Sequence, residues 1–250
     1  MKRGQITTFA IIGIIIVAAI LLVLYLRGQL NIPILGLGTA QERLNDIKEH
    51  ITGCIEDISE EPLRKIGLQG GHLATPEGTY RKRNDITISY LCYNIPDQSI
   101  CSNSLLLLNN MEKELAQAID QGLNNCINLE SFRRGYDMTT GKRVTTVTIG
   151  EENIAVIINL PVTLRDGETE VKENEFTALF NYPLGALYHV SQDIVNTEAS
   201  LGEFEQLSYM LSKRGKYEIQ KDKPYPDKLY TLHATNNDYT FQFFIQGEPN

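Results

Sequence analysis

The chain has 250 residues, of which 42% are hydrophobic, 22% are charged and 8% are aromatic. This balance is that of an ordinary globular protein, so it excludes a wholly disordered chain and a coiled-coil array. The 23 Lys and Arg residues against 31 Asp and Glu residues give a formal net charge of −8, which is the wrong sign for a nucleic-acid-binding surface.

One long apolar segment lies near the N-terminus. Residues 9–26 carry no strongly polar side chain, and the 21 residues from Ile6 onward would form a helix of about 31 Å, the thickness of a bilayer core. Lys2 and Arg3 precede this segment and Arg27 follows it, which predicts a cytoplasmic N-terminus and an exported remainder. We therefore expect a retained helix over 5–27 that meets membrane lipid or identical helices. The positions assigned to that contact are Phe9, Ile12, Gly13, Ile16, Ala19 and Val23.

The four residues Lys2-Arg3-Gly4-Gln5 stand directly before the apolar segment. This arrangement resembles the processing site of archaeal type IV pilin precursors, in which a membrane peptidase cuts after the glycine. The resemblance covers about residues 2–26, and it implies that residues 1–4 are a leader, that Gln5 becomes the N-terminus and that the helix packs in a filament core. Many bacterial pilins have Glu at the fifth mature position, where this chain has Phe9. The alternative is an uncleaved signal anchor whose basic pair sets the topology.

A linker and a capped helix follow. Residues 28–38 contain three glycines and Pro33, so they predict a linker, and residues 39–250 are expected to form one domain. Thr39 and Glu42 have the spacing of a capping box. The helix after it has an apolar stripe of Leu44, Ile47, Ile51, Cys54, Ile55 and Ile58. A second helix is expected to start at Ser59-Glu-Glu-Pro62 and to end at Gly70-Gly71.

The rest of the chain alternates between strand and helix patterns. In chain order we expect a strand at 86–93, a helix at 107–125, a hairpin of 142–149 with 154–164, a strand ending near 182, one or two helices over 184–211 broken near Gly202, and strands at 216–220, 229–234 and 239–246. The predicted fold class is α+β: a single transmembrane or filament-core helix, followed by one extracytoplasmic domain of helices and an antiparallel sheet.

The order of these elements resembles a family of uncharacterised membrane-anchored proteins of small-genome archaea. The matching features are Cys54 ahead of Leu68-Gln-Gly-Gly71, the helix from Glu112 to Cys126, and a hairpin with Leu160-Pro161-Val162. The likeness spans most of residues 40–200. Because that family has no established activity, it implies a location and an architecture only.

An even number of cysteines suits an oxidising exterior. Cys92 and Cys101 would close a short loop, and Cys54 and Cys126 lie on apolar faces of two expected helices. We therefore predict the nested pairing of Cys54 with Cys126 and Cys92 with Cys101. Buried free thiols are the alternative, and they would be favoured only in a cytosolic domain.

Sequence signals for catalysis or metal binding are weak. There is no G-x-S-x-G, H-E-x-x-H or Walker motif, and the cysteine spacing and dispersed histidines do not suit zinc, although His50 and Cys54 would make half a site. The basic clusters 81–83 and 213–214 are expected to be solvated. The tyrosines at 217, 225, 230 and 239 would either form a contact surface or pack a core, the second being favoured. We expect no catalytic residues, no metal, no cofactor and no enzymatic activity.

These observations predict a structural cell-surface protein. The leading hypothesis is a type IV pilin-like filament subunit, which is attached by its N-terminal helix to membrane lipid and then self-associates into a homo-oligomer or filament. The alternative is an anchored extracytoplasmic binding or adhesion domain that does not polymerise. Neither hypothesis includes a nucleic-acid partner.

Overall fold

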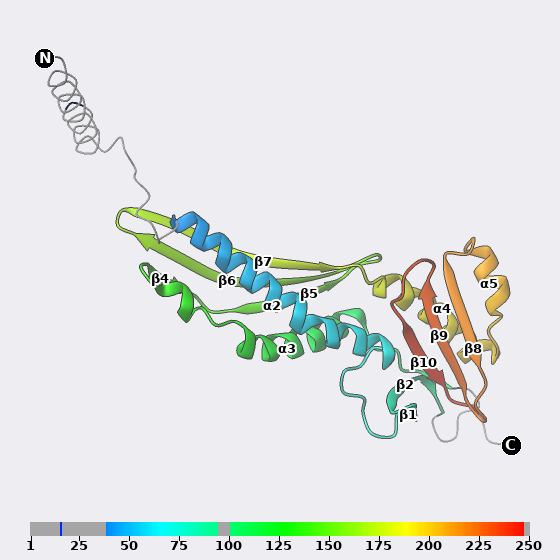
Figure 1. Cartoon of the computed structure of the whole chain (residues 1–250). Helices are drawn as coiled ribbons and strands as arrows, with labels where there is room; N and C mark the ends of the chain where they lie inside the picture. Colours follow the sequence, from blue (N-terminus) through cyan, green and yellow to red (C-terminus); the bar gives the residue numbers. More distant parts are fainter. Residues whose placement is uncertain (1–15, 17–38, 95–100, 248–250) are drawn as a thin grey trace, which may run out of the picture.

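The computed structural model describes residue 16 and residues 39–94 and 101–247 (Figure 1). The helices are α2 (Ala40–Leu68), α3 (Leu108–Cys126), the 3-10 helix η1 (Glu130–Arg133), α4 (Leu184–Leu201) and α5 (Gln206–Ser212). The strands are β1 (Tyr80–Arg83), β2 (Ile86–Tyr93), β3 (Ser102–Asn103), β4 (Asp137–Thr140), β5 (Val144–Ile149), β6 (Ile154–Asp166), β7 (Thr169–Phe180), β8 (Tyr217–Asp222), β9 (Lys228–Ala234) and β10 (Phe241–Ile245). The expected leader, the processing residues Gly4 and Gln5, the linker 28–38 and all assigned assembly positions except Ile16 lie outside the described residues.

Helix α2 begins as the sequence predicts. The Thr39 hydroxyl accepts a hydrogen bond from the Glu42 N–H at 3.2 Å, and the Glu42 carboxylate accepts one from the Thr39 N–H at 2.8 Å. The prediction of a second helix start near residue 59 is wrong, because α2 continues through Pro62 to Leu68. Leu63 and Ile66 extend the buried stripe, and their packing outweighs the hydrogen bond that Pro62 removes.

The first layer is a four-stranded antiparallel sheet that two helices cover. Strand β6 is central: β7 pairs with one of its edges, while β5 and β4 share the other edge end to end. Helix α2 packs on β7, helix α3 packs on β5, and the helices pack on each other. The alternating burial along β6 gives this sheet one covered face, which is the reason that the sequence shows a period of two there.

The second sheet is mixed, which corrects the antiparallel sheet that we expected. Its strand order is β1-β2-β10-β9-β8, with β3 on β2. Strand β10 runs parallel to β2, with Phe244 opposite Tyr90, and antiparallel to β9. A parallel pair needs a long connection, and here the connection includes α3 and all four strands of the first sheet. Alternation along each strand predicts that it is a strand but carries no signal for its direction.

The predicted fold class also needs correction in its first element. In residue 16 and residues 39–94 and 101–247, no helix is both long and apolar enough to cross a membrane. The longest of these helices, α2, presents exposed Glu and Lys side chains opposite its buried stripe. The segment that led to the expectation, 5–27, lies outside the described residues apart from Ile16.

One hydrophobic core runs through both sheets, from Leu44 and Ile47 on α2 to Phe241 and Phe243 on β10. The domain is elongated, with the start of α2 at one end and the mixed sheet at the other (Figure 1). Since α2 has 29 residues, it spans about 44 Å of that length. We call the mixed sheet and the elements packed on it the distal end.

Candidate functional site

Two disulfides join elements of the fold. Cys54 in the middle of α2 is bonded to Cys126 at the end of α3, with 72 residues of separation and a Cα–Cα distance of 5.7 Å. Cys92 in β2 is bonded to Cys101, nine residues away, with a Cα–Cα distance of 5.3 Å. This is the nested pairing that the sequence predicts. The first disulfide fastens the two covering helices to each other, and the second lies in the distal end.

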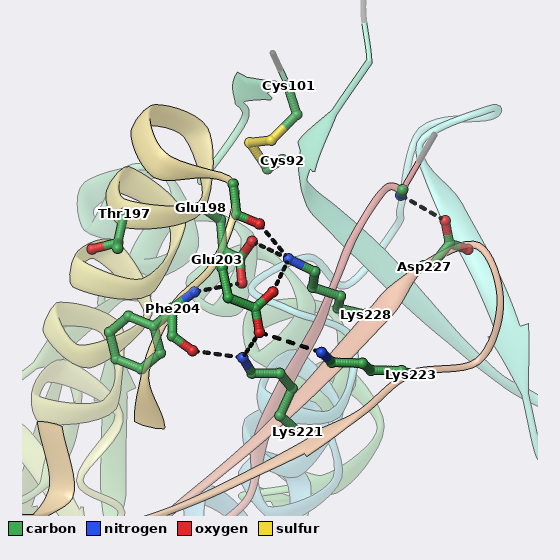
Figure 2. Close-up of polar contacts among 12 residues, drawn as sticks. Cys92, Cys101, Thr197, Glu198, Glu203, Phe204, Lys221, Lys223, Asp227 and Lys228 are labelled. Atoms are coloured by element: carbon green, nitrogen blue, oxygen red, sulfur yellow. Dashed lines mark hydrogen bonds and ion pairs between the residues drawn. A yellow bond between two sulfur atoms is a disulfide. The ribbon is translucent and has the colours of Figure 1, made fainter. Parts of the chain in front are cut away.

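Figure 2 shows a cluster of ionic side chains between α4 and the mixed sheet. We call it the lysine–glutamate cluster; its members are Glu198, Glu203, Lys221, Lys223 and Lys228. The side chain of Glu198 is 1% exposed and accepts hydrogen bonds from the Lys228 ammonium at 2.6 Å, the Phe204 N–H at 3.1 Å and the Tyr230 hydroxyl. Its buried charge is therefore fully paired, as a stable structure requires.

Glu203 completes this cluster on its solvent side. Its carboxylate lies 2.7 Å from the Lys221 ammonium, 2.8 Å from that of Lys228 and 3.3 Å from that of Lys223. Hydrogen bonds from Lys221 and then from Lys228 lower the pKa of Glu203 to about 2. Burial by itself would lower the pKa of Lys228, but its hydrogen bonds to Glu198 and Glu203 outweigh that effect and raise the pKa. Both shifts favour the charged forms of Glu203 and Lys228, and the ion pair of Lys228 with Glu198 holds α4 on the sheet.

A second buried carboxylate, Asp227, fixes strand β1 at the edge of the sheet. It accepts hydrogen bonds from the Arg81 guanidinium at 2.6 Å, the Tyr90 hydroxyl at 2.7 Å and the Gly247 N–H at 3.1 Å. Burial, and then the hydrogen bond to Asp227, raise the pKa of Tyr90 well above its ordinary value. Arg83 pairs with Asp222 on the same face at 3.0 Å. Since residues alternate along a strand, Tyr80 and Lys82 are on the opposite face of β1.

That opposite face of β1 borders a pocket with a volume of about 650 Å³. The pocket lies between the last two turns of α2 and the β1–β2 hairpin. Leu68, Leu73 and Ile86 are its aliphatic members, and the polar and charged ones are Glu61, Arg64, Lys65, Gln69, Thr75, Tyr80, Lys82, Asp85 and Thr87. We call it the α2–β1 pocket and regard it as the candidate binding site.

Gln69 is the most buried residue of this pocket. The residue is 7% exposed, and its backbone is fully used: its N–H caps α2, and its carbonyl accepts hydrogen bonds from the Ser89 N–H at 3.2 Å and the Ser89 hydroxyl at 2.6 Å. Its side-chain amide, by contrast, has no hydrogen bond to any described residue. The amide atoms are not among the buried unpaired polar atoms of the described residues, so the amide meets the space of the pocket and is open to a partner from outside the protein.

The structure does not assemble a metal site from the histidines. Among the described residues there is no group of three or more His, Cys, Asp or Glu side chains that would hold a metal ion. The half-site that we considered is not formed, because Cys54 is in a disulfide. The Nε2 atom of His50 is buried and has no hydrogen-bond partner among the residues that the structure describes, and the His50 ring lies 5.5 Å from the ring of Phe132.

The basic and tyrosine residues singled out in the sequence differ in how exposed they are. Lys82 is exposed as expected, but Arg81 is half-buried and ion-paired on the other face of the same strand. Tyr230 and Tyr239 lie in the core, in agreement with the favoured prediction, whereas Tyr225 is 67% exposed. The sequence prediction missed the α2–β1 pocket altogether. The only signal was the alternation of Tyr80, Arg81 and Lys82, which places unlike residues on opposite faces.

We compared the chain with models of known protein families, with curated proteins and with solved structures, and nothing matches it.

Proposed function

We propose that the chain is a structural protein of the cell surface whose folded domain lies outside the cytoplasm. The observation that supports this proposal is the pair of disulfides, Cys54–Cys126 and Cys92–Cys101, which leaves no cysteine as a free thiol. Disulfides form and persist in oxidising compartments and are rare in the cytosol. The role that we propose for the domain is display and binding.

The shape of the domain favours display. The first described helix starts at Ala40, at the opposite end of the domain from the mixed sheet (Figure 1). If the chain is attached through the sequence that precedes residue 39, the layer of α2, α3 and the first sheet holds the distal end away from the attachment. The α2–β1 pocket lies at that far end, where a ligand would reach it.

The proposed means of attachment is the apolar sequence 9–26, in contact with membrane lipid or with the same segment of other copies. A pilin-like filament subunit is the second candidate function, and the specific observation that favours it is the Lys2–Gln5 sequence directly before the apolar run. An anchored domain that does not polymerise is favoured by the glycines and proline of residues 28–38, which interrupt a continuous helix from attachment to domain.

Two measurements on cells that make the protein test these proposals. Alkylation with a maleimide before lysis, followed by a peptide map without reduction, should find all four cysteines blocked, and protease added to intact cells should remove the domain. Free thiols in a protease-protected domain would overturn the surface location. Mass spectrometry and electron microscopy then separate the two forms of attachment: Gln5 as N-terminus together with fibres supports the filament subunit, whereas an intact N-terminus without fibres supports the anchored domain.

Substitution of Gly4 gives a sharper test of processing. Gly4→Leu should leave the N-terminus uncut and prevent fibres if the pilin-like proposal holds, because the peptidase would no longer find its glycine. Gly28→Leu, beyond the apolar run, is the matched control and should be processed as the unchanged chain is. Fibres formed equally well by Gly4→Leu would refute the filament proposal.

A further inference from the structure

The α2–β1 pocket combines an amide that has no partner in the described protein with balanced charge. Arg64 is already engaged by Glu60 at 2.5 Å and by the Tyr182 ring at 5.2 Å. The four other ionic side chains of the pocket are Glu61, Lys65, Lys82 and Asp85. These four form no ion pair or hydrogen bond with any residue that the structure describes. The pocket therefore has two free carboxylates and two free ammonium groups whose charges balance, while the charge of Arg64 is balanced by Glu60 beside the pocket.

This balance favours a neutral ligand with many hydroxyl groups. A strongly anionic or cationic ligand would meet one like charge for each opposite charge, and the like charges would cost as much as the others contribute. A hydroxyl group, by contrast, donates to a carboxylate and accepts from an ammonium, so both signs contribute to its binding. The Gln69 amide both donates and accepts, and the Thr75 and Thr87 hydroxyls add further groups of the same kind.

The apolar part of the pocket suits the carbon face of a sugar ring. Leu68, Leu73 and Ile86 are half-buried residues of its wall. Tyr80 is also half-buried, and in the described structure its ring stacks on no other aromatic ring. An aromatic face carries partial negative charge and attracts C–H groups with partial positive charge, such as those on one side of a pyranose. The volume of about 650 Å³ is within the usual range for ligand pockets, roughly 300–1,000 Å³, and leaves room for a short oligosaccharide.

We propose that the α2–β1 pocket binds a neutral oligosaccharide, with the Gln69 amide hydrogen-bonded to ring hydroxyls and Tyr80 stacked on a sugar face. The inference rests on the proposed function, since a domain displayed at the cell surface meets glycans there. It makes the pocket a recognition site and gives the distal end its partner. No covalent step is involved.

The test uses the purified full-length protein and a printed array that carries neutral oligosaccharides, anionic oligosaccharides and extended peptides. The strongest ligand is then titrated by calorimetry. We expect neutral oligosaccharides to bind, and Gln69→Met to weaken the strongest of them about tenfold or more, because that variant keeps the side-chain length but removes the amide. Gln69→Met should remain folded, since the amide makes no hydrogen bond within the described protein, and thermal unfolding checks this.

Gln121→Met is the matched control, because Gln121 is exposed on α3 and lies outside the pocket. It should bind as the unchanged protein does. The proposal is overturned if no neutral oligosaccharide binds, if only anionic sugars or only peptides bind, or if Gln69→Met binds as well as Gln121→Met. Binding is measured with purified protein, so a failure here is distinct from a failure of the surface location, which the cysteine and protease experiments detect.

Discussion

The end of helix α2 lies against the backbone of the mixed sheet at Gly67. A Gly→Ala substitution, which adds one methyl group, tests how close this contact is. Gly67 is buried in the last turn of α2, next to the turn between β9 and β10. A Cβ atom at this position would lie 2.3 Å from the Thr240 carbonyl oxygen and 2.8 Å from the Tyr239 hydroxyl oxygen. Gly53 is in the same helix, and a Cβ atom there would have nothing within 4 Å. The two glycines are therefore matched in conformation and opposite in surroundings.

Gly53→Ala should stabilise the protein by about 1 kcal/mol, which is the difference in helix propensity between glycine and alanine. Gly67→Ala receives the same contribution but has to move the helix end or the strand turn by about 1 Å to reach an ordinary contact distance. Such overpacking costs about 1–3 kcal/mol. The displacement also disturbs the hydrogen bond from the Tyr239 hydroxyl to the Leu63 carbonyl, at 2.7 Å, which is worth about 1 kcal/mol. We expect a net loss of about 2 kcal/mol, and a difference of about 3 kcal/mol between the two variants.

Urea unfolding of the full-length chain, followed by far-ultraviolet circular dichroism, measures this difference. Both variants and the unchanged protein are purified in the same detergent solution, and the slope against urea should be equal for all three. The reasoning is refuted if Gly67→Ala is as stable as the unchanged protein, or if both substitutions shift the midpoint in the same direction.

Three further predictions concern the disulfides and the lysine–glutamate cluster. Replacing Cys54 and Cys126 by Ala should lower the free energy of unfolding by about 4 kcal/mol, since their separation of 72 residues restricts the unfolded chain strongly, and urea unfolding should show a smaller loss for the nine-residue disulfide. Because the pKa of Glu203 is lowered from 4.5 to about 2, its stabilisation is complete above pH 4.5 and disappears as the pH falls through 2; Glu203→Gln should flatten that part of the stability curve. Glu198→Leu should cost about 3–5 kcal/mol by leaving Lys228 partly unpaired in the interior, and adding Lys228→Met should cost less than the sum of the two single changes.

Local signals in the sequence predicted the elements that local physics determines. The capping box at Thr39 works through hydrogen bonds between residues three positions apart, so four residues are enough to find it. The helix break near Gly202 depends on a left-handed conformation, φ 76°, that glycine adopts without strain. The cysteine pairs follow from an even count together with apolar helix faces. The evidence for the cap and for the break lies within a few turns of the chain, whereas the pairing of Cys54 with Cys126 spans 72 residues.

Pairings between distant segments could not be predicted in this way. Whether α2 stops or continues at Pro62 depends on partners for Leu63 and Ile66 that lie elsewhere in the chain. The parallel pairing of β10 with β2 joins segments about 150 residues apart, and no local pattern encodes it. Short strands such as β3, with two residues, have too little sequence to show alternation.

The α2–β1 pocket shows why a search of the sequence for motifs can miss a binding site. Its most buried residue, Gln69, follows a helix and precedes Gly70 and Gly71, so the sequence indicates only that it belongs to the end of a helix. The glycines take φ values of +73° and +95°, which turn the chain sharply and leave Gln69 facing the hairpin of β1 and β2. The site therefore comes from where the helix ends in space, and no set of catalytic or ligating residue types marks it.

The close approach at Gly67 and the pocket at Gln69 are two results of the same packing. Helix α2 approaches the turn before β10 closely at Gly67, which has no Cβ atom, and the Gln242 side chain donates a hydrogen bond to the Leu68 carbonyl at 2.9 Å. Two residues after Gly67, the N–H of Gln69 caps the helix and its carbonyl accepts from Ser89, while its side-chain amide has no partner among the described residues. The backbone that carries this amide is thus held by hydrogen bonds to β2 at Gln69 and to β10 at Leu68. An ordered backbone of this kind favours recognition, because its ordering has already been achieved during folding and is not a cost of binding.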